Sequence, residues 1–342
     1  MTQVLKPLRS QVIVITGASS GIGLVTARTA AKSGAAVVVA ARNEDALQAL
    51  VEEIRAAGGR ARHVVADVGR EEDVALIADT ARQAFGRFDT WVNNAGVSIF
   101  GSVDEVSIED MHRMMDTNYW GVVYGSREAV AEFKGRTGSH GALINVGSVF
   151  GDRATVVQSS YSSTKHAVHG WTDALRMEME AHHVPVSVTL LHPGRIDTPY
   201  NEHAQSYIDH QPAHRGMIYP PETVAEAILH AATHPTRDLF IGSQVKLGVV
   251  AAAIAPRLMD HLMKWHMFRS QSADRPSRRT GDSALHQPGY GLHERGTHQG
   301  WVRGRSYYLK AEKHPALTAV LVLAAVGAGL TQIGQRRPKE TT

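Results

Sequence analysis

The chain has 342 residues, 43% of them hydrophobic, which suffices for one large α/β domain with an appendage. A formal charge of only +3 argues against nucleic-acid binding, and the absence of cysteine excludes disulfides and thiolate metal sites. The 19 histidines are scattered without the spacing of a helical zinc motif, so we expect no metal and place most of them on the surface. The first residues form no long apolar run, so we expect no secretory signal and a cytoplasmic location.

Short β-branched runs alternate with longer helical patterns from about residue 10 to 245. The expected strands are 11–15, 35–40, 62–66, 90–93, 142–146, 186–191 and 238–241. The expected helices are 21–33, 44–57, 71–85, 108–133, 159–181 and 221–233. Strands separated by helices of this length pair in parallel, so the sequence predicts an α/β fold with a doubly wound sheet.

The alternation stops near residue 270. Residues 271–306 are rich in Arg, Gly, His, Ser and Gln and poor in aliphatic side chains, which predicts a flexible linker. We therefore divide the chain into a catalytic domain at 8–268, a linker at 269–312, and an apolar helix with a basic tail at 313–342.

The apolar stretch 316–333 carries no charge. As a helix it would span about 27 Å, just short of a bilayer core, so it is a candidate membrane anchor at the cytoplasmic face. The alternative is a helix that packs on the domain or on a partner chain. Basic residues flank both ends, so charge does not settle an orientation.

A glycine-rich turn, Thr16-Gly-Ala-Ser-Ser-Gly-Ile-Gly23, joins the first strand to the first helix. Gly17 permits a tight turn, while Gly21 and Gly23 let the backbone approach a pyrophosphate. The free N–H groups at the helix start favour that phosphate. The turn therefore predicts a dinucleotide site.

The end of the second strand bears on the cofactor. Folds that take NAD usually place an acid there, whereas this chain has Ala41 followed by Arg42. A guanidinium binds a 2′-phosphate bidentately, so Arg42 favours NADP(H) over NAD(H). The alternative is a solvated arginine that starts a helix.

Tyr161 and Lys165 are four residues apart, so on a helix both side chains reach one site. A nearby cation favours the phenolate and lowers the tyrosine pKa, which predicts an acid/base pair. Taken alone, this spacing also occurs on amphipathic helices.

Together these motifs resemble the short-chain dehydrogenase/reductase family over residues 10 to 245, with its Rossmann-type fold. They are TGxxxGxG at 16–23, Asp67 with Val68, NNAG at 93–96, Asn118, Ser148, Tyr161 with Lys165, and Pro193-Gly194 followed by Ile196 and Thr198. Two features depart from the pattern. Ser20 stands where NADP-dependent relatives often carry a basic residue, and the last hundred residues exceed the family core.

The resemblance implies a site. The catalytic residues would be Asn118, Ser148, Tyr161 and Lys165. The cofactor would be bound by Thr16, Gly17, Ser19, Ser20, Gly21, Ile22, Gly23, Arg42, Asp67, Val68, Asn94, Ala95, Gly96, Tyr161, Lys165, Pro193, Gly194, Ile196 and Thr198. Tyr161 would exchange a proton with the substrate oxygen, Ser148 would stabilise developing charge, and Asn118 would hold a water near Lys165.

The implied function is an NADP(H)-dependent oxidoreductase that interconverts an alcohol with a ketone or aldehyde. The polar segment 200–219 resembles the family's substrate lid, with Tyr200, His203, Tyr207, Ile208 and Met217 as candidate contacts. The tail adds the alternative of a lipophilic substrate, and the resemblance implies a homo-oligomer through 108–133 and 159–181. An alternative from another class is a membrane-associated NADP(H)-binding scaffold or sensor without turnover.

Overall fold

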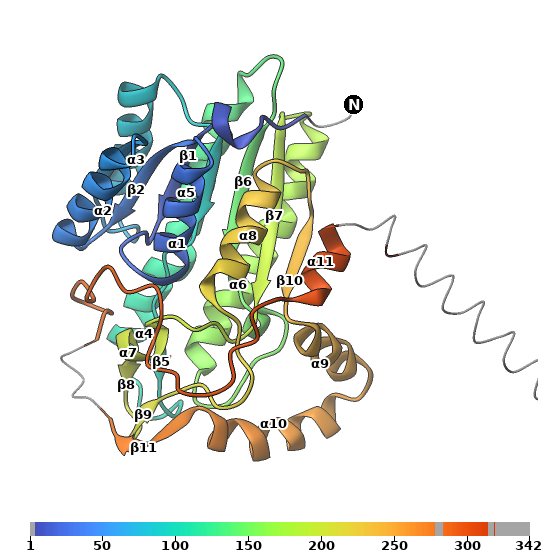
Figure 1. Cartoon of the computed structure of the whole chain (residues 1–342). Helices are drawn as coiled ribbons and strands as arrows, with labels where there is room; N and C mark the ends of the chain where they lie inside the picture. Colours follow the sequence, from blue (N-terminus) through green and yellow to red (C-terminus); the bar gives the residue numbers. More distant parts are fainter. Residues whose placement is uncertain (1–3, 278–282, 314–317, 319–342) are drawn as a thin grey trace, which may run out of the picture.

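The computed structural model describes residues 4–277, 283–313 and 318. Its centre is a parallel sheet of seven strands in the order β10-β7-β6-β4-β1-β2-β3 (Figure 1). The strands are β1 Val12–Thr16, β2 Ala36–Ala41, β3 Arg60–Val65, β4 Thr90–Asn93, β6 Gly141–Val146, β7 Val186–Pro193 and β10 Asp238–Ile241. The predicted α/β fold with a doubly wound sheet is confirmed.

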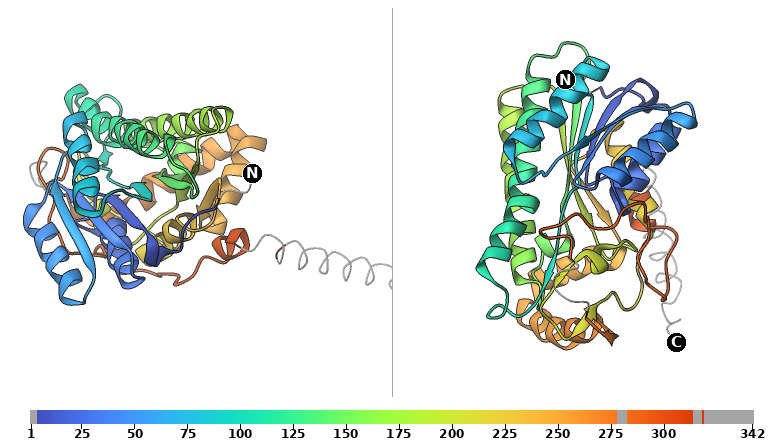
Figure 2. Two further views of the ribbon diagram at one scale, coloured as in Figure 1. Left: turned by 90° about the horizontal axis from the view of Figure 1, so that it is seen from above. Right: turned by 90° about the vertical axis from the view of Figure 1, so that its left-hand side faces the viewer.

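Helices cover both faces of this sheet (Figure 2). They are α1 Gly21–Lys32, α2 Glu44–Ala56, α3 Glu71–Phe85, α4 Ile108–Met115, α5 Gly121–Lys134, α6 Ser159–Ala181 and α8 Pro221–Ala231. Ile13 and Ile15 pack in the layer of α1, α2 and α8, while Val12 and Val14 pack in the layer of α3, α5 and α6. Because both faces are buried, most of the strands read as continuous apolar runs.

The strand order reverses beside β1. The chain runs outward through β2 and β3, then crosses to β4 on the other side of β1 and continues through β6, β7 and β10. Ligands of open α/β sheets bind at such a switch point, outside the carboxyl ends of the strands. The predicted motifs at 16–23 and 93–96 meet there.

The predicted helix 108–133 is divided by a π turn, η2 Asp116–Trp120, between α4 and α5. Single π turns inside helices are frequent at functional sites, and this one carries Asn118. The segment 200–219 is also more regular than a loop. It contains α7 Tyr200–His203, β8 Gln205–Ser206 paired with β5 Ile99–Phe100, and β9 His210–Pro212.

The expectation of a linker at 271–306 does not describe the residues that follow 283. After α9 Ser243–Ile254 and α10 Pro256–Ser270, β11 Ser272–Pro276 pairs with β9. Residues 283–303 then lie along the carboxyl edge of the sheet and lead to α11 Tyr307–Lys313 (Figure 1). Leu285 and Leu309 are buried, because the domain supplies apolar sites that the composition of the segment does not reveal.

The candidate anchor 316–333 lies outside the described residues except for Thr318. Among the helices of residues 4–277 and 283–313, none has the length and apolar character needed to cross a bilayer.

Candidate active site

A cavity of about 250 Å³ opens at the carboxyl ends of the strands beside the switch point. Most of the predicted site residues line it: Gly17, Ser19, Ser20, Gly21, Ile22, Arg42, Asp67, Val68, Asn94, Ala95, Gly96, Ser148, Tyr161, Lys165, Pro193, Gly194, Ile196 and Thr198. Thr16, Gly23 and Asn118 stand behind this wall. The sequence motifs therefore converge on one cavity, with three of the predicted residues in supporting positions.

The glycine turn is held from behind by the neighbouring strand. Thr16 Oγ1 accepts hydrogen bonds from Asn94 N at 3.0 Å and Ala95 N at 3.1 Å, and Asn94 Nδ2 donates to Thr16 O at 2.9 Å. Gly17 has φ +66°, and a Cβ on Gly23 would lie within 3.0 Å of Gly17 O. The two glycines let α1 begin directly against the turn. The Gly21 N–H donates to His293 O, and the next N–H groups of the first turn have no partner within the helix.

The end of the cavity at Arg42 is ordered by charged and backbone groups. Arg42 Nη1 donates to Leu285 O at 3.0 Å, and Arg42 Nη2 donates to Ala284 O. Asp67 forms an ion pair with Arg113 and accepts from Gly69 N at 3.0 Å. Arg113 and the carbonyls of 284 and 285 were not predicted, since no local motif links them to Arg42.

A buried ladder of amides ties the strands to α6. Asn93 Nδ2 donates to Asn145 Oδ1 at 2.9 Å, and Asn145 Nδ2 donates to Thr172 Oγ1 at 3.0 Å. Trp91 Nε1 donates to Asn93 Oδ1 at 2.7 Å. Because buried polar groups are costly when unpaired, this ladder fixes α6 against β4 and β6. It thereby fixes the helix face that carries Tyr161 and Lys165.

Tyr161 and Lys165 share that face, and both are buried. Lys165 Nζ donates to Val146 O at 2.9 Å and lies 5.8 Å from the centroid of the Tyr161 ring. Burial lowers the pKa of Lys165 to about 8. Burial also raises the pKa of Tyr161, against the opposing effect of hydrogen bonds with Ser148 and Tyr200. The pKa of Tyr161 thus shifts opposite to the direction expected from the spacing, and the phenol is protonated at neutral pH.

Ser148 and Asn118 have different surroundings. Ser148 caps a 3₁₀ turn, η3 Val149–Gly151, and its Oγ accepts from Phe150 N at 3.1 Å. The Asn118 amide accepts from Val97 N at 2.8 Å and donates to Val97 O and Thr164 Oγ1. The side chain of Asn118 therefore holds the chain at Val97, and its Oδ1 and Lys165 Nζ both lie within 4 Å of where a Cβ on Gly96 would stand. Its predicted role in holding a water near Lys165 stays a prediction.

The Tyr161 end of the cavity is covered by aromatic and polar groups that the family motifs do not include, and we call this cover the roof. The Tyr200 hydroxyl donates to Ser98 Oγ at 2.7 Å and accepts from Gln158 Nε2 at 2.9 Å. The Tyr200 ring lies 5.7 Å from the Tyr161 ring and stacks on His214 at 6.1 Å. Burial raises the pKa of Tyr200 and lowers the pKa of His214 to about 3.

The lid expectation is met in part. Tyr200 and His203 line the cavity, whereas Tyr207 is not among the lining residues and its hydroxyl donates to Asp110 Oδ2 at 2.7 Å. Ile208 and Met217 are also not among the lining residues.

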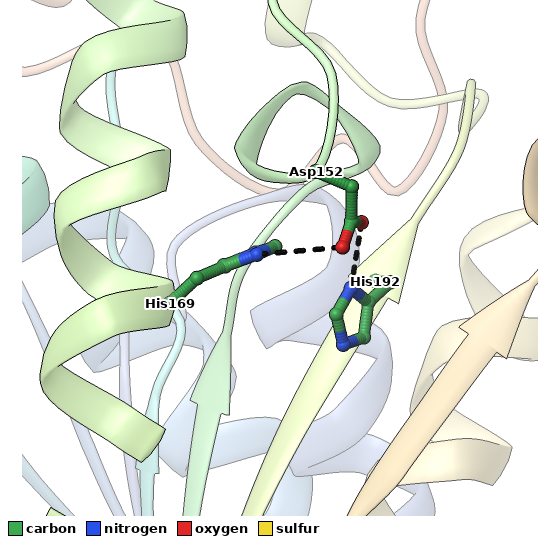
Figure 3. Close-up of side chains that lie close together, drawn as sticks. All are labelled: Asp152, His169 and His192. Carbon is green, nitrogen blue, oxygen red and sulfur yellow. Dashed lines mark hydrogen bonds and ion pairs between the residues drawn. The ribbon is translucent and has the colours of Figure 1, made fainter. Parts of the chain in front are cut away.

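Behind Ser148, a cluster of Asp152, His169 and His192 joins three elements (Figure 3). His192 Nδ1 lies 2.8 Å from Asp152 Oδ2, and His169 Nδ1 lies 3.7 Å from Asp152 Oδ1. Ser148 N donates to His169 Nε2 at 3.5 Å, and His192 Nε2 lies 3.3 Å from Asp238 Oδ1. These groups have the types and spacing of metal ligands, but three of the four ring nitrogens already have hydrogen-bond partners.

The histidines of this cluster differ in charge. Burial, with a smaller contribution from His192, lowers the pKa of His169 to about 3, so His169 is neutral. Burial lowers the pKa of His192, but hydrogen bonds to Asp152 and Asp238 outweigh it and leave that pKa raised. His169 and His192 are interior residues, whereas most of the other histidines in the described part of the chain are exposed or half-buried, as the sequence predicted.

The family model for short chain dehydrogenases matches residues 11–208, more than half of the chain. The chain therefore belongs to the short-chain dehydrogenase/reductase family and is an oxidoreductase of that family.

Several relatives share most of its length. Uncharacterized oxidoreductase YxnA of Bacillus subtilis (strain 168) is 62% identical over 323 residues, which cover 94% of this chain and 90% of that protein. Putative oxidoreductase SadH of Mycobacterium tuberculosis (strain ATCC 25618 / H37Rv) is 31% identical over 258 residues, 73% of this chain and 92% of its own. Among solved structures, a short chain dehydrogenase/reductase from Burkholderia phymatum in complex with NAD superposes with a TM-score of 0.68 at 26% identity. That match covers 74% of this chain and 96% of the other.

Proposed function

We propose that this protein is an NADP(H)-dependent oxidoreductase that interconverts an alcohol with a ketone or aldehyde, with Tyr161 as the acid/base. The observation that carries the proposal is that Ser148, Tyr161 and Lys165 converge at one end of a cavity whose other end holds Arg42. A binding scaffold has no need of such a set. The neighbour from Burkholderia phymatum was solved in complex with NAD, which supports a nicotinamide dinucleotide as the cofactor.

The residues present fit such a cofactor. Gly17 and Gly23 let the turn and α1 pack closely against Asn94 and Ala95, and the N–H groups that follow Gly21 at the start of α1 would bind a phosphate. Pro193, Gly194 and Thr198 line the wall nearer Tyr161, where they would hold the nicotinamide. When bound, the nicotinamide ring supplies or accepts the hydride. Asn94 and Ala95, set by Thr16, would line its path.

Tyr161 would exchange a proton with the substrate oxygen. Since burial raises the pKa of Tyr161, the phenol is ready to donate to a carbonyl oxygen in the reductive direction. Ser148 would donate a hydrogen bond to the same oxygen and stabilise the charge that develops there. Lys165, with a pKa of about 8, is mostly protonated at neutral pH and would stabilise the phenolate that remains. Asn118 acts from behind by fixing Val97 at the cavity wall.

Arg42 supports the choice of NADP(H). A guanidinium has five N–H donors, and two of its nitrogens bond the carbonyls of Ala284 and Leu285. The remaining donors can bind a 2′-phosphate. Ala41 stands where an acid would otherwise meet a ribose hydroxyl.

The roof of the Tyr161 end favours an apolar substrate. Phe150 lies edge-on to Tyr161 at 6.4 Å, and Tyr200 and His214 complete an aromatic surface. The hydroxyl of Tyr200 is already engaged with Ser98 and Gln158. The groups that face the substrate are therefore mainly uncharged rings, which suit a lipophilic carbonyl compound.

The resemblance to the family also bears on the assembly of this chain into an oligomer. Trp120 and Met177 are exposed large side chains, 42% and 62% accessible, on the helices that the resemblance assigns to subunit contacts. We propose a homo-oligomer through this surface and a cytoplasmic location. The role of 316–333 as a contact with the cytoplasmic membrane face stays a prediction. Light scattering of the purified protein and fractionation of cells with and without residues 316–342 test these points.

The function itself is tested by following NADPH and NADH depletion with the purified enzyme against a panel of aldehydes and ketones. We expect turnover with aromatic or long-chain carbonyl compounds and faster turnover with NADPH. Tight cofactor binding with no turnover across the panel would favour the scaffold alternative.

A further inference from the structure

Residues 283–297, which we call the strap, reach across the mouth of the cavity and return. Both ends are rooted beside α7: Ala284 N donates to His203 O at 2.8 Å, and Thr297 N donates to Glu202 Oε1 at 2.9 Å. Between these roots the strap crosses to α1 and α2 on the opposite bank, as the orange-red chain in Figure 1 shows. The strap therefore joins the two sides of the cavity, which we call its banks: α7 on one side, and α1 with α2 on the other.

The first crossing is anchored by Leu285. Its side chain is fully buried in an apolar cluster that includes Val97, Met114 and Tyr161. Its backbone carbonyl accepts from Arg42 Nη1 at 3.0 Å and from Arg113 Nε at 3.3 Å. One residue of the strap thus packs beside the Tyr161 end and also holds the Arg42 end.

The middle of the strap bonds the glycine turn. Leu292 N donates to Ser19 O at 2.8 Å, and Gly21 N donates to His293 O at 2.9 Å. Asn43 Nδ2 donates to Gly289 O at 2.8 Å while its Oδ1 caps α2. These bonds join the strap to the segment that the proposed cofactor phosphates would contact.

Two glycines allow this close approach. A Cβ on Gly291 would lie within 3.0 Å of Ala46 Cβ, and a Cβ on Gly296 would lie within 3.0 Å of Thr198 O. Real Cβ atoms essentially never come so close, so a side chain at either position would push the strap outward. The strap is in close contact with both banks.

The cavity lies beneath it. Ala284, Pro288 and Gly289 line the same cavity as Gly17 and Tyr161. A dinucleotide that extends from Arg42 to Tyr161 would lie between the sheet edge and the strap, with the strap between it and solvent.

We propose that the strap is part of the cofactor site: it covers the bound dinucleotide, holds Arg42 in position for the 2′-phosphate, and lifts to let the cofactor exchange. The inference rests on the proposed function. It predicts that weakening the strap speeds release of both cofactors and lowers the preference for NADPH, because Arg42 loses its backbone partners.

Gly291→Ala tests the proposal without altering a residue of the cavity wall. Its matched control is Gly304→Ala, since a Cβ at Gly304 meets nothing within 4 Å. A second variant combines Gly291→Ala with Ala46→Gly, which removes the atom that the new Cβ would meet; the other neighbours lie at 3.4 Å or more. Release of NADPH and NADH is measured by stopped-flow fluorescence, affinities by titration, and folding by thermal unfolding.

We expect Gly291→Ala to accelerate release of both cofactors about tenfold, as an overpacked contact should, and to reduce the NADPH-to-NADH affinity ratio. In the double variant, the release rates and the affinity ratio should return toward the wild-type values. Gly304→Ala should give wild-type values throughout. Unchanged release in Gly291→Ala, or no recovery in the double variant, would overturn the strap's role in exchange. An unchanged affinity ratio would overturn its role at Arg42. Binding without turnover would count against the proposed function alone, whereas no binding by any variant would sink both.

Discussion

The two ends of the cavity are built from different parts of the chain. At the Tyr161 end, side chains from the family core converge: Ser148 after β6, and Tyr161 with Lys165 from α6. At the Arg42 end, backbone carbonyls of the C-terminal extension meet a core arginine. The comparison teaches that local helical geometry places the side chains of the Tyr161 end, whereas the Arg42 end depends on contacts between segments more than 200 residues apart.

Tyr161→Phe should have the largest effect, because the proposed proton donor is lost while the packing of the ring is kept. We expect turnover to fall by about 10³-fold, within the range for general acid–base catalysis, with cofactor affinity nearly unchanged. Steady-state kinetics and NADPH titration measure the two quantities. Tyr207→Phe is the matched control, since its hydroxyl bonds Asp110 and Ser107 rather than lining the cavity. Comparable turnover in Tyr161→Phe would remove the chemical role of this end.

Arg42→Gln should act at the other end and affect mainly one cofactor. Losing charge-assisted bonds to a 2′-phosphate should lower kcat/KM for NADPH about 10- to 100-fold and leave the NADH value much less affected. Arg70→Gln, an exposed arginine paired with Glu72, serves as the control. Equal losses for NADPH and NADH would mean that Arg42 serves the strap alone and that the choice of cofactor lies elsewhere.

The sequence could predict that the residues of the Tyr161 end lie together, for a physical reason. Residues four apart on a helix share a face, and the carboxyl ends of parallel strands meet at one edge, so spacing alone brings Tyr161, Lys165 and the glycine turn together. The protonation of Tyr161 could not be predicted the same way. It depends on burial by the roof at Tyr200 and Phe150, which lie on segments with no periodic relation to α6.

The sequence predicted a flexible linker where the strap lies, because composition reports only the apolar side chains within a segment and not the apolar sites that the rest of the chain offers it. Residues 283–297 bring little, but Leu285 enters a cluster that the core has already formed, and the backbone of the strap pairs with Arg42, Ser19 and Gly21. Their partners are distant in sequence, and single-sequence patterns carry no information on such pairings. A close reading of α6 could have found His169, because positions 161, 165 and 169 follow each other at helical spacing.

His169 gives the smallest expected effect, on stability against pH. Its pKa is about 3 in the folded protein and near 6.5 when unfolded, so between these values the unfolded chain binds one more proton. The stability from neutral His169 is complete above pH 6.5 and is lost as pH falls toward 3. The charged or titratable groups around it are Asp152, His192, Lys165 and His166. The raised pKa of His192 acts in the opposite sense and at higher pH, since its stabilisation is lost as pH rises through the folded value.

His169→Gln keeps an acceptor for Ser148 N but removes the titrating group. In urea unfolding from pH 4.5 to 6.5, we expect the rise of unfolding free energy with pH to become shallower by up to about 1.4 kcal/mol per pH unit, the value for one proton. His214, whose pKa is also about 3, keeps its own contribution in both proteins and serves as an internal reference. His182→Gln, at the exposed end of α6, controls for the loss of a histidine. An unchanged pH dependence in His169→Gln would show that the ring is not held neutral, and the cluster behind Ser148 would then need a different charge assignment from the one that its distances support.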